Sequence, residues 1–400
     1  KGSKSVAVGY NSLGNQNFTS STDTFNTAVG HTAGLSVTTG IRNTLIGALA
    51  GDALTDADRN TAVGYIALSA DTLGSRSTAI GHGALQLQNF TSATDAFNTA
   101  VGHSAGLAVT TGVNNTLIGG EAGDAITTAG SNVAVGYKSL TTTTTGANNV
   151  AIGVLALEMN TTGAGNTALG REALEANTTA SNNTAVGLKA GELVTTGTEN
   201  TLIGALAGDA TTTGDHNTAV GYHSLGANTT GDENTAMGRA ALFANTTGDK
   251  NVAIGDHALS ENTTADGNTA VGESALLANT TGADNVAIGK ASLDSNTTGV
   301  RNTAVGAQSL PGNTTGDFNV AIGRDAMHNN TTADSNTAVG YGAFYTNTTG
   351  TGNTAIGFNT LDAATTADGN TAVGSNALGA NTSGASNTGI GLGSLQLNTT

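Results

Sequence analysis

A 17-residue motif recurs in tandem along this 400-residue chain, and between residues 132 and 387 it does so without any insertion or deletion. Its consensus is N-T-A-V-G-x-x-A-L-x-x-N-T-T-G-x-x, and the positions of each unit are numbered 1 to 17 below. Counting earlier units, the motif begins 23 times. A fixed period of this length predicts a stack of repeats in which each unit contacts only its neighbours.

The regularity of the repeat divides the chain into two parts. Residues 1–131 contain two longer, 21-residue units, which begin at Ser5 and Ser77, and most of a duplicated 72-residue block. Residues 132–400 contain only 17-residue units. We therefore expect irregular coils over 1–131 and regular coils over 132–400.

The apolar pattern within each unit predicts strands. Position 4 is Val, Ile, Leu or Met in all 23 units, position 5 is always Gly, and position 9 is usually Leu. Small and aliphatic residues alternate around position 4 with the period of a strand, whereas helical spacing is absent and Gly, Asn and Thr are frequent. We expect the residues of position 4 to form the core column, with Gly at position 5 where the chain bends or adopts positive φ. The predicted core column includes Val135, Ile152, Val220, Ile254, Ile288 and Ile322, and the predicted structural glycines include Gly136, Gly153, Gly221 and Gly255.

Stacking is needed for stability, because one unit buries only two or three aliphatic side chains. These contribute roughly 1.5–3 kcal/mol each, against an ordering cost of about 1.5 kcal/mol per residue. Stacked coils share backbone hydrogen bonds, and Asn at positions 1 and 12 forms columns whose amides bond from coil to coil. The sequence thus predicts an all-β fold, a β-solenoid of about 23 coils, most of them 17-residue coils.

Charge and composition exclude several classes of partner. The net charge of −16, with only 13 Lys and Arg residues, opposes binding to nucleic acid or to an anionic membrane surface. The chain has no Cys and no apolar run long enough to span a bilayer, so we predict no membrane insertion in this segment. An extracellular location, on a cell surface or a virion, fits this composition.

The N-V-A-I-G and N-T-A-V-G motifs, as at residues 251–255 and 285–289, resemble the head repeats of YadA-like trimeric autotransporter adhesins. Similar repeats occur in phage tail fibres. The resemblance covers residues 5–400, although the 17-residue unit here is longer than the family's usual repeat. It implies a left-handed parallel β-roll, a homotrimer, and binding to a host surface or matrix ligand.

An oligomer is also expected on physical grounds. A roll that is two short strands across has little interior and leaves one apolar strip exposed. A symmetric homo-oligomer, or contact with neighbouring fibre subunits, would cover that strip along its whole length.

No residue pattern indicates catalysis, a metal or a cofactor, so we predict that the chain is not an enzyme. His31, His82 and His103 share the variable position 6 with Tyr65 and Tyr137, which favours exposed side chains. The recurrent Asp residues near the turn, as at Asp215, favour a solvated acidic edge, because no calcium-binding nonapeptide is present.

The chain is poor in aromatic residues, yet Phe18, Phe25, Phe90 and Phe97 lie in the two 21-residue units. They are the candidate contacts for a ligand or a neighbouring fibre, although local packing explains them at least as well. Asn-Thr-Thr at position 12 matches the N-glycosylation motif and is also the expected turn.

The predicted function is that of a structural and adhesive rod in an extracellular or virion-surface fibre. Three alternatives stay open at this point. They are the shaft of a phage tail fibre, a self-assembling extracellular filament, and an ice-binding solenoid that uses Thr columns such as Thr229, Thr246, Thr263 and Thr280.

Overall fold

The computed structural model describes residues 2–400, which form strands, turns and bends. The chain divides into two compact units, one ending at Asn200 and one beginning at Thr201. Each unit is a parallel β-solenoid, and together they hold about 23 coils, so the predicted all-β solenoid is confirmed. Among residues 2–400, no helix is long and apolar enough to cross a membrane.

The strands are short and evenly spaced. The first unit contains β1 (Gly2–Ser3), β2 (Val6–Val8), β3 (Thr22–Asp23), β4 (Thr27–Val29), β5 (Thr44–Ile46), β6 (Thr61–Val63), β7 (Gly74–Ser75), β8 (Thr78–Ile80), β9 (Thr94–Asp95), β10 (Thr99–Val101), β11 (Thr116–Ile118), β12 (Val133–Val135), β13 (Val150–Ile152), β14 (Thr167–Leu169) and β15 (Thr184–Val186). The second unit contains β16 (Thr201–Ile203), β17 (Thr218–Val220), β18 (Thr235–Met237), β19 (Val252–Ile254), β20 (Thr269–Val271), β21 (Val286–Ile288), β22 (Thr303–Val305), β23 (Val320–Ile322), β24 (Thr337–Val339), β25 (Thr354–Ile356), β26 (Thr371–Val373) and β27 (Thr388–Ile390).

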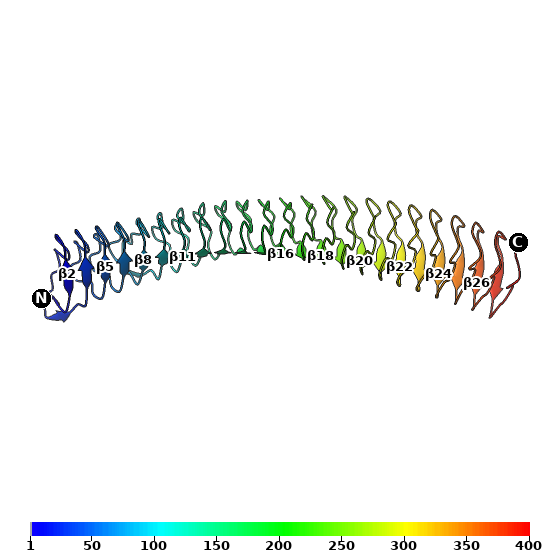
Figure 1. Cartoon of the computed structure of the whole chain (residues 1–400), viewed down its shortest axis with the longest axis horizontal. Coiled ribbons are helices and arrows are strands. Elements are labelled where there is room, and N and C mark those ends of the chain that lie inside the picture. Colours follow the sequence, from blue (N-terminus) through cyan, green and yellow to red (C-terminus); the bar gives the residue numbers. More distant parts are fainter. Residues whose placement is uncertain (1) are drawn as a thin grey trace. The chain divides into compact units, whose positions relative to one another are not determined.

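Equivalent residues of successive coils pair in register. In β17 and β18, for example, Ala219 pairs with Ala236 and Val220 with Met237, in parallel. Figure 1 shows the result in each unit, one arrow per coil with successive arrows side by side. The two 21-residue coils keep this register and add a second short parallel pair, β1 with β3 and β7 with β9. Like residues therefore stack in columns, as the period predicts.

Each regular coil has one strand, where we expected two. The segment around position 9 is a series of turns, because residues at positions 7 and 9 adopt left-handed backbone conformations. His223 has φ +53° and Leu225 has φ +54°, and the same pattern recurs from coil to coil. Residues with φ near +55° cannot continue a β-strand. The coil therefore turns back on itself after position 5 and encloses a narrow interior.

The core is built from position 3, position 8 and position 9. Ala219, at position 3, and Leu225, at position 9, are completely buried, as are their equivalents in nearly every coil. Position 8 is a buried Ala or Ser in most coils, and Ser224 there satisfies its hydroxyl by donating to the Gly221 carbonyl at 3.0 Å. Each buried Leu contributes roughly 1.5–3 kcal/mol. The predicted second apolar position is therefore confirmed as core.

In some coils the large side chain of the core stands at position 3 instead of position 9. Coils with Leu45, Leu117 or Leu202 at position 3 have Gly at position 9. At Gly208, an added Cβ would lie 2.7 Å from Cδ2 of Leu202, so the Leu of position 3 fills the space that the Leu of position 9 occupies elsewhere. Such a volume-conserving exchange preserves dense packing.

The glycine of position 5 is required by the neighbouring coil. Gly221 has φ +136°, and a Cβ there would lie 2.5 Å from the carbonyl oxygen of Gly238, the equivalent residue one coil later. Gly136, Gly153 and Gly255 have φ between +139° and +142°, and each faces the equivalent glycine of the next coil in the same way. The structural role predicted for these four glycines is confirmed.

Asparagine columns run inside the turns. At position 12, Nδ2 of Asn262 donates to Oδ1 of Asn245 at 2.9 Å and to the Ala265 carbonyl at 3.0 Å. This amide ladder continues from Asn228 to Asn347. At position 1, Oδ1 of Asn234 accepts from the backbone N–H of Asn251 at 3.0 Å. The predicted coil-to-coil amide bonding is confirmed, and the side chains of position 1 also bond to backbone groups.

One carboxylate stands in the column of position 12. Asp71 is completely buried, and its oxygens accept from the Gly74 N–H at 3.0 Å and from Nε2 of Gln88 at 2.7 Å. Burial raises the pKa of Asp71 above its ordinary value, and the hydrogen bonds from Gln88 and Gly74 only partly oppose this.

Replacement of Asp71 by Asn is expected to stabilise the first unit at neutral pH. A carboxyl with a raised pKa in the folded state contributes stability below its unfolded pKa of 3.8, and this is lost as the pH rises through the folded pKa. Gly74 and Gln88 donate to different oxygens of Asp71, so the single amide oxygen of Asp71→Asn keeps at least one of these bonds, as Asn177 accepts from the Ala180 N–H and Asn245 accepts from Nδ2 of Asn262. Thermal unfolding followed across pH should show a higher midpoint for Asp71→Asn than for the parent at neutral pH. This difference in midpoint should disappear below pH 3.8. The control is Asp56→Asn, which removes an exposed carboxylate and should not reproduce this pH-dependent difference in midpoint. Equal midpoints for the parent and Asp71→Asn at every pH would contradict the prediction.

Candidate functional site

The apolar side chains of position 4 lie on the outer face of the strands. Ile254, Ile288 and Ile322 are 38%, 40% and 39% exposed. Ile152 is exposed to the same degree, and Val135 and Val220 are half-buried. The prediction that these six residues form the core was wrong. They do form the predicted column, but on the surface of the chain.

The exposure of position 4 and the burial of position 3 follow from the geometry of a three-residue strand. Side chains at positions 2 and 4 point to one face and the side chain at position 3 points to the other. Position 3 faces the closed side of the coil, where Ala253 is completely buried between the turns. The interior at this level accommodates Ala, with Leu only where position 9 is Gly. The larger aliphatic residue therefore occupies the outward position.

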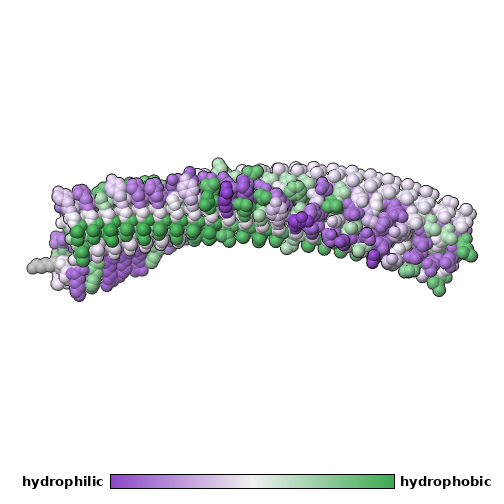
Figure 2. All heavy atoms as spheres, in the orientation of Figure 1, coloured by the Kyte–Doolittle hydropathy of each residue, from purple (hydrophilic) through white to green (hydrophobic). Residues whose placement is uncertain are grey.

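The exposed column continues from coil to coil within each unit. The exposed members are Val8, Val29, Ile46, Ile80, Ile118, Ile152 and Leu169 in the first unit, and Ile203, Met237, Ile254, Ile288, Ile322, Ile356 and Ile390 in the second. Val residues between them are half-buried. Figure 2 shows this column in the first unit as a green band along the strands. An apolar strip repeated over so many coils exceeds the scattered exposure usual for a monomer.

The rest of this strand face is flat and uncharged. Position 2, which shares the face, is Thr or Val in every coil, and no coil has a charged residue at position 2 or 4. Thr235 and Val252, for example, are half-buried. We call positions 2 and 4 together the strand face. Its apolar and uncharged chemistry suits association with a second flat surface.

Aromatic side chains of position 6 stack along the solenoid beside the strand face. Tyr10 and His31 stack with ring centroids 5.3 Å apart, and His82 and His103 stack at 5.1 Å with nearly parallel planes. All four are exposed, as the sequence predicts for position 6. Since successive coils place position 6 at neighbouring levels, this stacking follows from the repeat itself.

The four predicted phenylalanine contacts behave differently from one another. Phe25 and Phe97 are about half exposed, and each ring lies 5.3 Å from a cation, Lys4 or Arg76. Phe18 is only half-buried, but Phe90 is 5% exposed and packs inside its 21-residue coil. Phe90 is therefore a packing residue, and the prediction of a ligand contact there was wrong. The other three stay candidates.

The acidic column at position 16, whose members are half-buried or exposed, has a structural role. Oδ1 of Asp232 accepts from the backbone N–H of Asp215 at 2.8 Å, and Asp249 does the same for Asp232. Where the column has Ser, as at Ser181, the hydroxyl accepts from the equivalent N–H of Ala164 at 3.0 Å. These side chains satisfy a backbone donor that the solenoid leaves unpaired.

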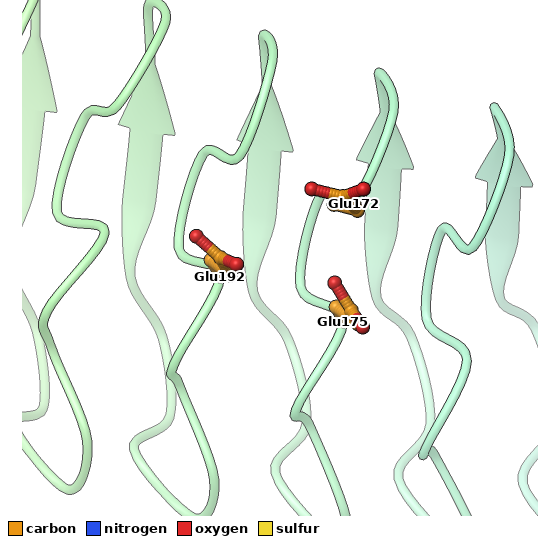
Figure 3. A group of neighbouring side chains, drawn as sticks. All are labelled: Glu172, Glu175 and Glu192. Carbon is orange, nitrogen blue, oxygen red and sulfur yellow. The ribbon is translucent and has the colours of Figure 1, made fainter.

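Glu172, Glu175 and Glu192 are close enough to hold a metal ion, with carboxylate oxygens within 4.8 Å of one another (Figure 3). Two cations already lie in this cluster. Nη2 of Arg171 is 2.5 Å from Glu172, and Nζ of Lys189 is 3.2 Å from Glu172 and 2.9 Å from Glu192. The hydrogen bond from Arg171, helped by Lys189, lowers the pKa of Glu172. Glu172 and Glu192 therefore belong to an ion-pair network, whereas burial, together with Glu172 and other neighbouring carboxylates, raises the pKa of Glu175.

The Asn residues of the Asn-Thr-Thr turns are completely buried in the folded chain, except Asn398, which is half-buried. Asn228, Asn245 and Asn262 are completely buried, and the Nδ2 atoms of all three donate hydrogen bonds. A glycan on Nδ2 would break the ladder, so glycosylation of these sites is incompatible with this fold.

No protein-family model matches the chain, and no curated protein is significantly similar to it.

Proposed function

We propose that this chain is a structural and adhesive rod of an extracellular or virion-surface fibre, assembled from three parallel copies that bury the strand face. The observation that carries the proposal is the exposed apolar column at position 4, which recurs in coil after coil. In this assembly each chain is a left-handed roll of the kind implied by the resemblance to YadA-like heads.

Symmetry supports association of identical chains. Copies aligned in parallel share the 17-residue period, so every coil of one copy meets an equivalent coil of the next. Burial of partly exposed Val and Ile side chains contributes about 25 cal/mol per Å² of apolar surface. One coil alone adds little free energy to the interface, but the same contribution repeats in the coils of both units. An interface without charges on positions 2 and 4 also avoids the cost of burying unpaired ions.

Adhesion is assigned to the remaining surface. Positions 6, 7, 10 and 11 vary among charged, polar, aromatic and apolar residues, while the core and the strand face are nearly constant. Surface positions that a repeat leaves free to vary are those where ligand recognition can be placed without disturbing the fold. A bacterial adhesin and a phage tail fibre would share this physical design.

The oligomeric state tests the proposal. Light scattering of the purified chain is expected to give three times the mass of one chain, independent of dilution in the working range. A stable folded monomer would overturn it. A mass that grows without limit as concentration rises would favour a self-assembling filament instead.

A second candidate is ice binding, favoured by the regularity of the strand face. The Thr column of position 13 is unsuitable for binding ice. The hydroxyls of Thr229, Thr246 and Thr263 donate to carbonyls of the next coil at 2.9–3.1 Å. The strand face, however, presents Thr and Val or Ile side chains at regular spacing without charges. Thermal hysteresis of the monomeric chain would support this function over the fibre.

A further inference from the structure

A pocket in the second unit lies on the side of the solenoid that carries the variable positions. It has a volume of about 310 Å³ and is lined by Tyr222, His223, Arg239, Phe243, His257 and Glu261, among others. These residues occupy positions 6, 7, 10 and 11 of successive coils. The pocket therefore includes no residue of the strand face, although its position 6 residues lie beside that face.

Aromatic rings form one wall of this pocket. Tyr222 and Phe243 are 54% and 40% exposed, large fractions for aromatic side chains. His223 lies between them in edge contacts, with centroid distances of 4.4 Å to Tyr222 and 5.7 Å to Phe243. These contacts hold the rings in place, so the wall is rigid and available for stacking.

Polar groups form the opposite rim. Arg239 donates to both carboxylate oxygens of Asp256, at 2.9 and 3.0 Å, and Nδ1 of His257 lies 3.2 Å from the same carboxylate. Nδ1 of His223 is buried and has no hydrogen-bond partner within residues 2–400. A buried polar atom without a partner costs stability unless a ligand or water supplies one.

We propose that this pocket binds a neutral saccharide. A pyranose ring presents C–H groups on one face, which stack on aromatic rings, and hydroxyls around its edge, which suit carboxylate, guanidinium and imidazole groups. The positive charge of Arg239 is paired with Asp256 beside the pocket, and Glu261 adds a negative charge to the lining, so the pocket disfavours an anionic ligand. The pocket is small and open to solvent, which suits one or two sugar units at the edge of a larger glycan.

A second pocket of the same unit repeats this combination. It has a volume of about 360 Å³ and is lined by Tyr341, Tyr345, Asp325, Asn359 and Asp362, among others. These residues again occupy positions 6, 7 and 10. Two aromatic residues beside hydrogen-bonding groups at equivalent positions point to two weak subsites, whose combined use on one glycan would raise the overall affinity.

The inference rests on the adhesive function proposed above and specifies its ligand class, but its test is independent of the oligomeric state. The probes are methyl glycosides of glucose, galactose and mannose, together with chitobiose and maltotriose, each added to the full chain. Saturation-transfer difference NMR is expected to show binding of at least one probe. Tyr222→Ala and Phe243→Ala should each weaken that binding roughly tenfold, because each removes one stacking surface.

Tyr137→Ala is the matched control, because Tyr137 also occupies position 6 and is 50% exposed, outside both pockets. It should leave binding unchanged. Failure of every probe to bind, or equal losses in Tyr137→Ala and Tyr222→Ala, would overturn the saccharide site. A trimer that binds no probe would overturn the ligand class alone, whereas a monomer that binds would overturn the trimer alone.

Discussion

When Ile254, Ile288 and Ile322 are replaced together by Asp, the proposed trimer is expected to dissociate into folded single chains. Each Asp would place a charge without a partner at the centre of the proposed interface, and breaking such an interface with an unpaired charge typically costs several kcal/mol. In the single chain these three positions are about 40% exposed, so the carboxylates stay hydrated and the solenoid persists. Light scattering should report a threefold fall in mass, while circular dichroism stays that of the parent.

The same three coils offer the control. Thr264, Thr298 and Thr332 stand at position 14, are exposed, and lie away from the strand face. Their joint replacement by Asp adds the same charge and should leave the mass unchanged. If the control dissociates equally, general charge repulsion is the cause. If the Ile variants keep the parent mass, the strand face is not the interface.

Replacement of Gly221 by Ala is expected to open the solenoid locally around β17 and β18. The backbone at φ +136° costs an L-residue about 1–3 kcal/mol. In addition, the new Cβ would overlap the Gly238 carbonyl at 2.5 Å, which forces two coils apart. The unfolding midpoint of the second unit should fall by roughly 5–10 °C. Hydrogen exchange of the β17 and β18 amides should become faster.

Gly352→Asn is the matched control for this substitution. Gly352 also has positive φ, at +64°, but a Cβ there meets no atom within 4 Å. Asn occurs at the equivalent position with nearly the same φ, as at Asn148 and Asn182. This variant should unfold within a degree or two of the parent. An equal loss in both variants would contradict the role assigned to the contact between Gly221 and Gly238.

Much of the architecture could be predicted from the period. Identical spacing forces like residues into columns, so the parallel register, the Asn ladder and the glycine of position 5 all follow from one pattern. These features depend on contacts between equivalent residues, which a repeat specifies directly. The predicted column at position 4 also exists, in the register expected.

The direction in which that column faces was predicted wrongly, because large aliphatic residues are usually buried. The sequence does contain a better signal. Leu at position 3 is accompanied by Gly at position 9, as in Leu202 and Gly208, which is the compensation required inside a closed space. Position 4 mostly alternates between Val and a larger aliphatic residue from coil to coil, and Val, Ile, Leu and Met there all occur with Ala at position 3 and Leu at position 9, so no interior residue compensates for their difference in size.

Features that occur in single coils could not be predicted from the repeat pattern. Phe90 packs inside its 21-residue coil, and Asp71 is buried because position 12 lies inside the coil, where Gln88 of the next coil donates a hydrogen bond to it. The pocket between Tyr222 and Phe243 likewise arises from residues in different coils at variable positions. Variable positions carry no periodic signal, so their spatial neighbours become evident only once the coils are stacked.

The register of the regular coils has an evolutionary consequence. Hydrogen bonds between neighbouring coils in the second unit join residues one repeat unit apart, so removing or inserting one whole unit reconnects equivalent partners. Recombination within the coding repeat can therefore lengthen or shorten such a protein in whole-coil steps while its cross-section stays the same. The number of coils can therefore change in evolution separately from the fold of each coil and from the proposed binding pockets at the variable positions.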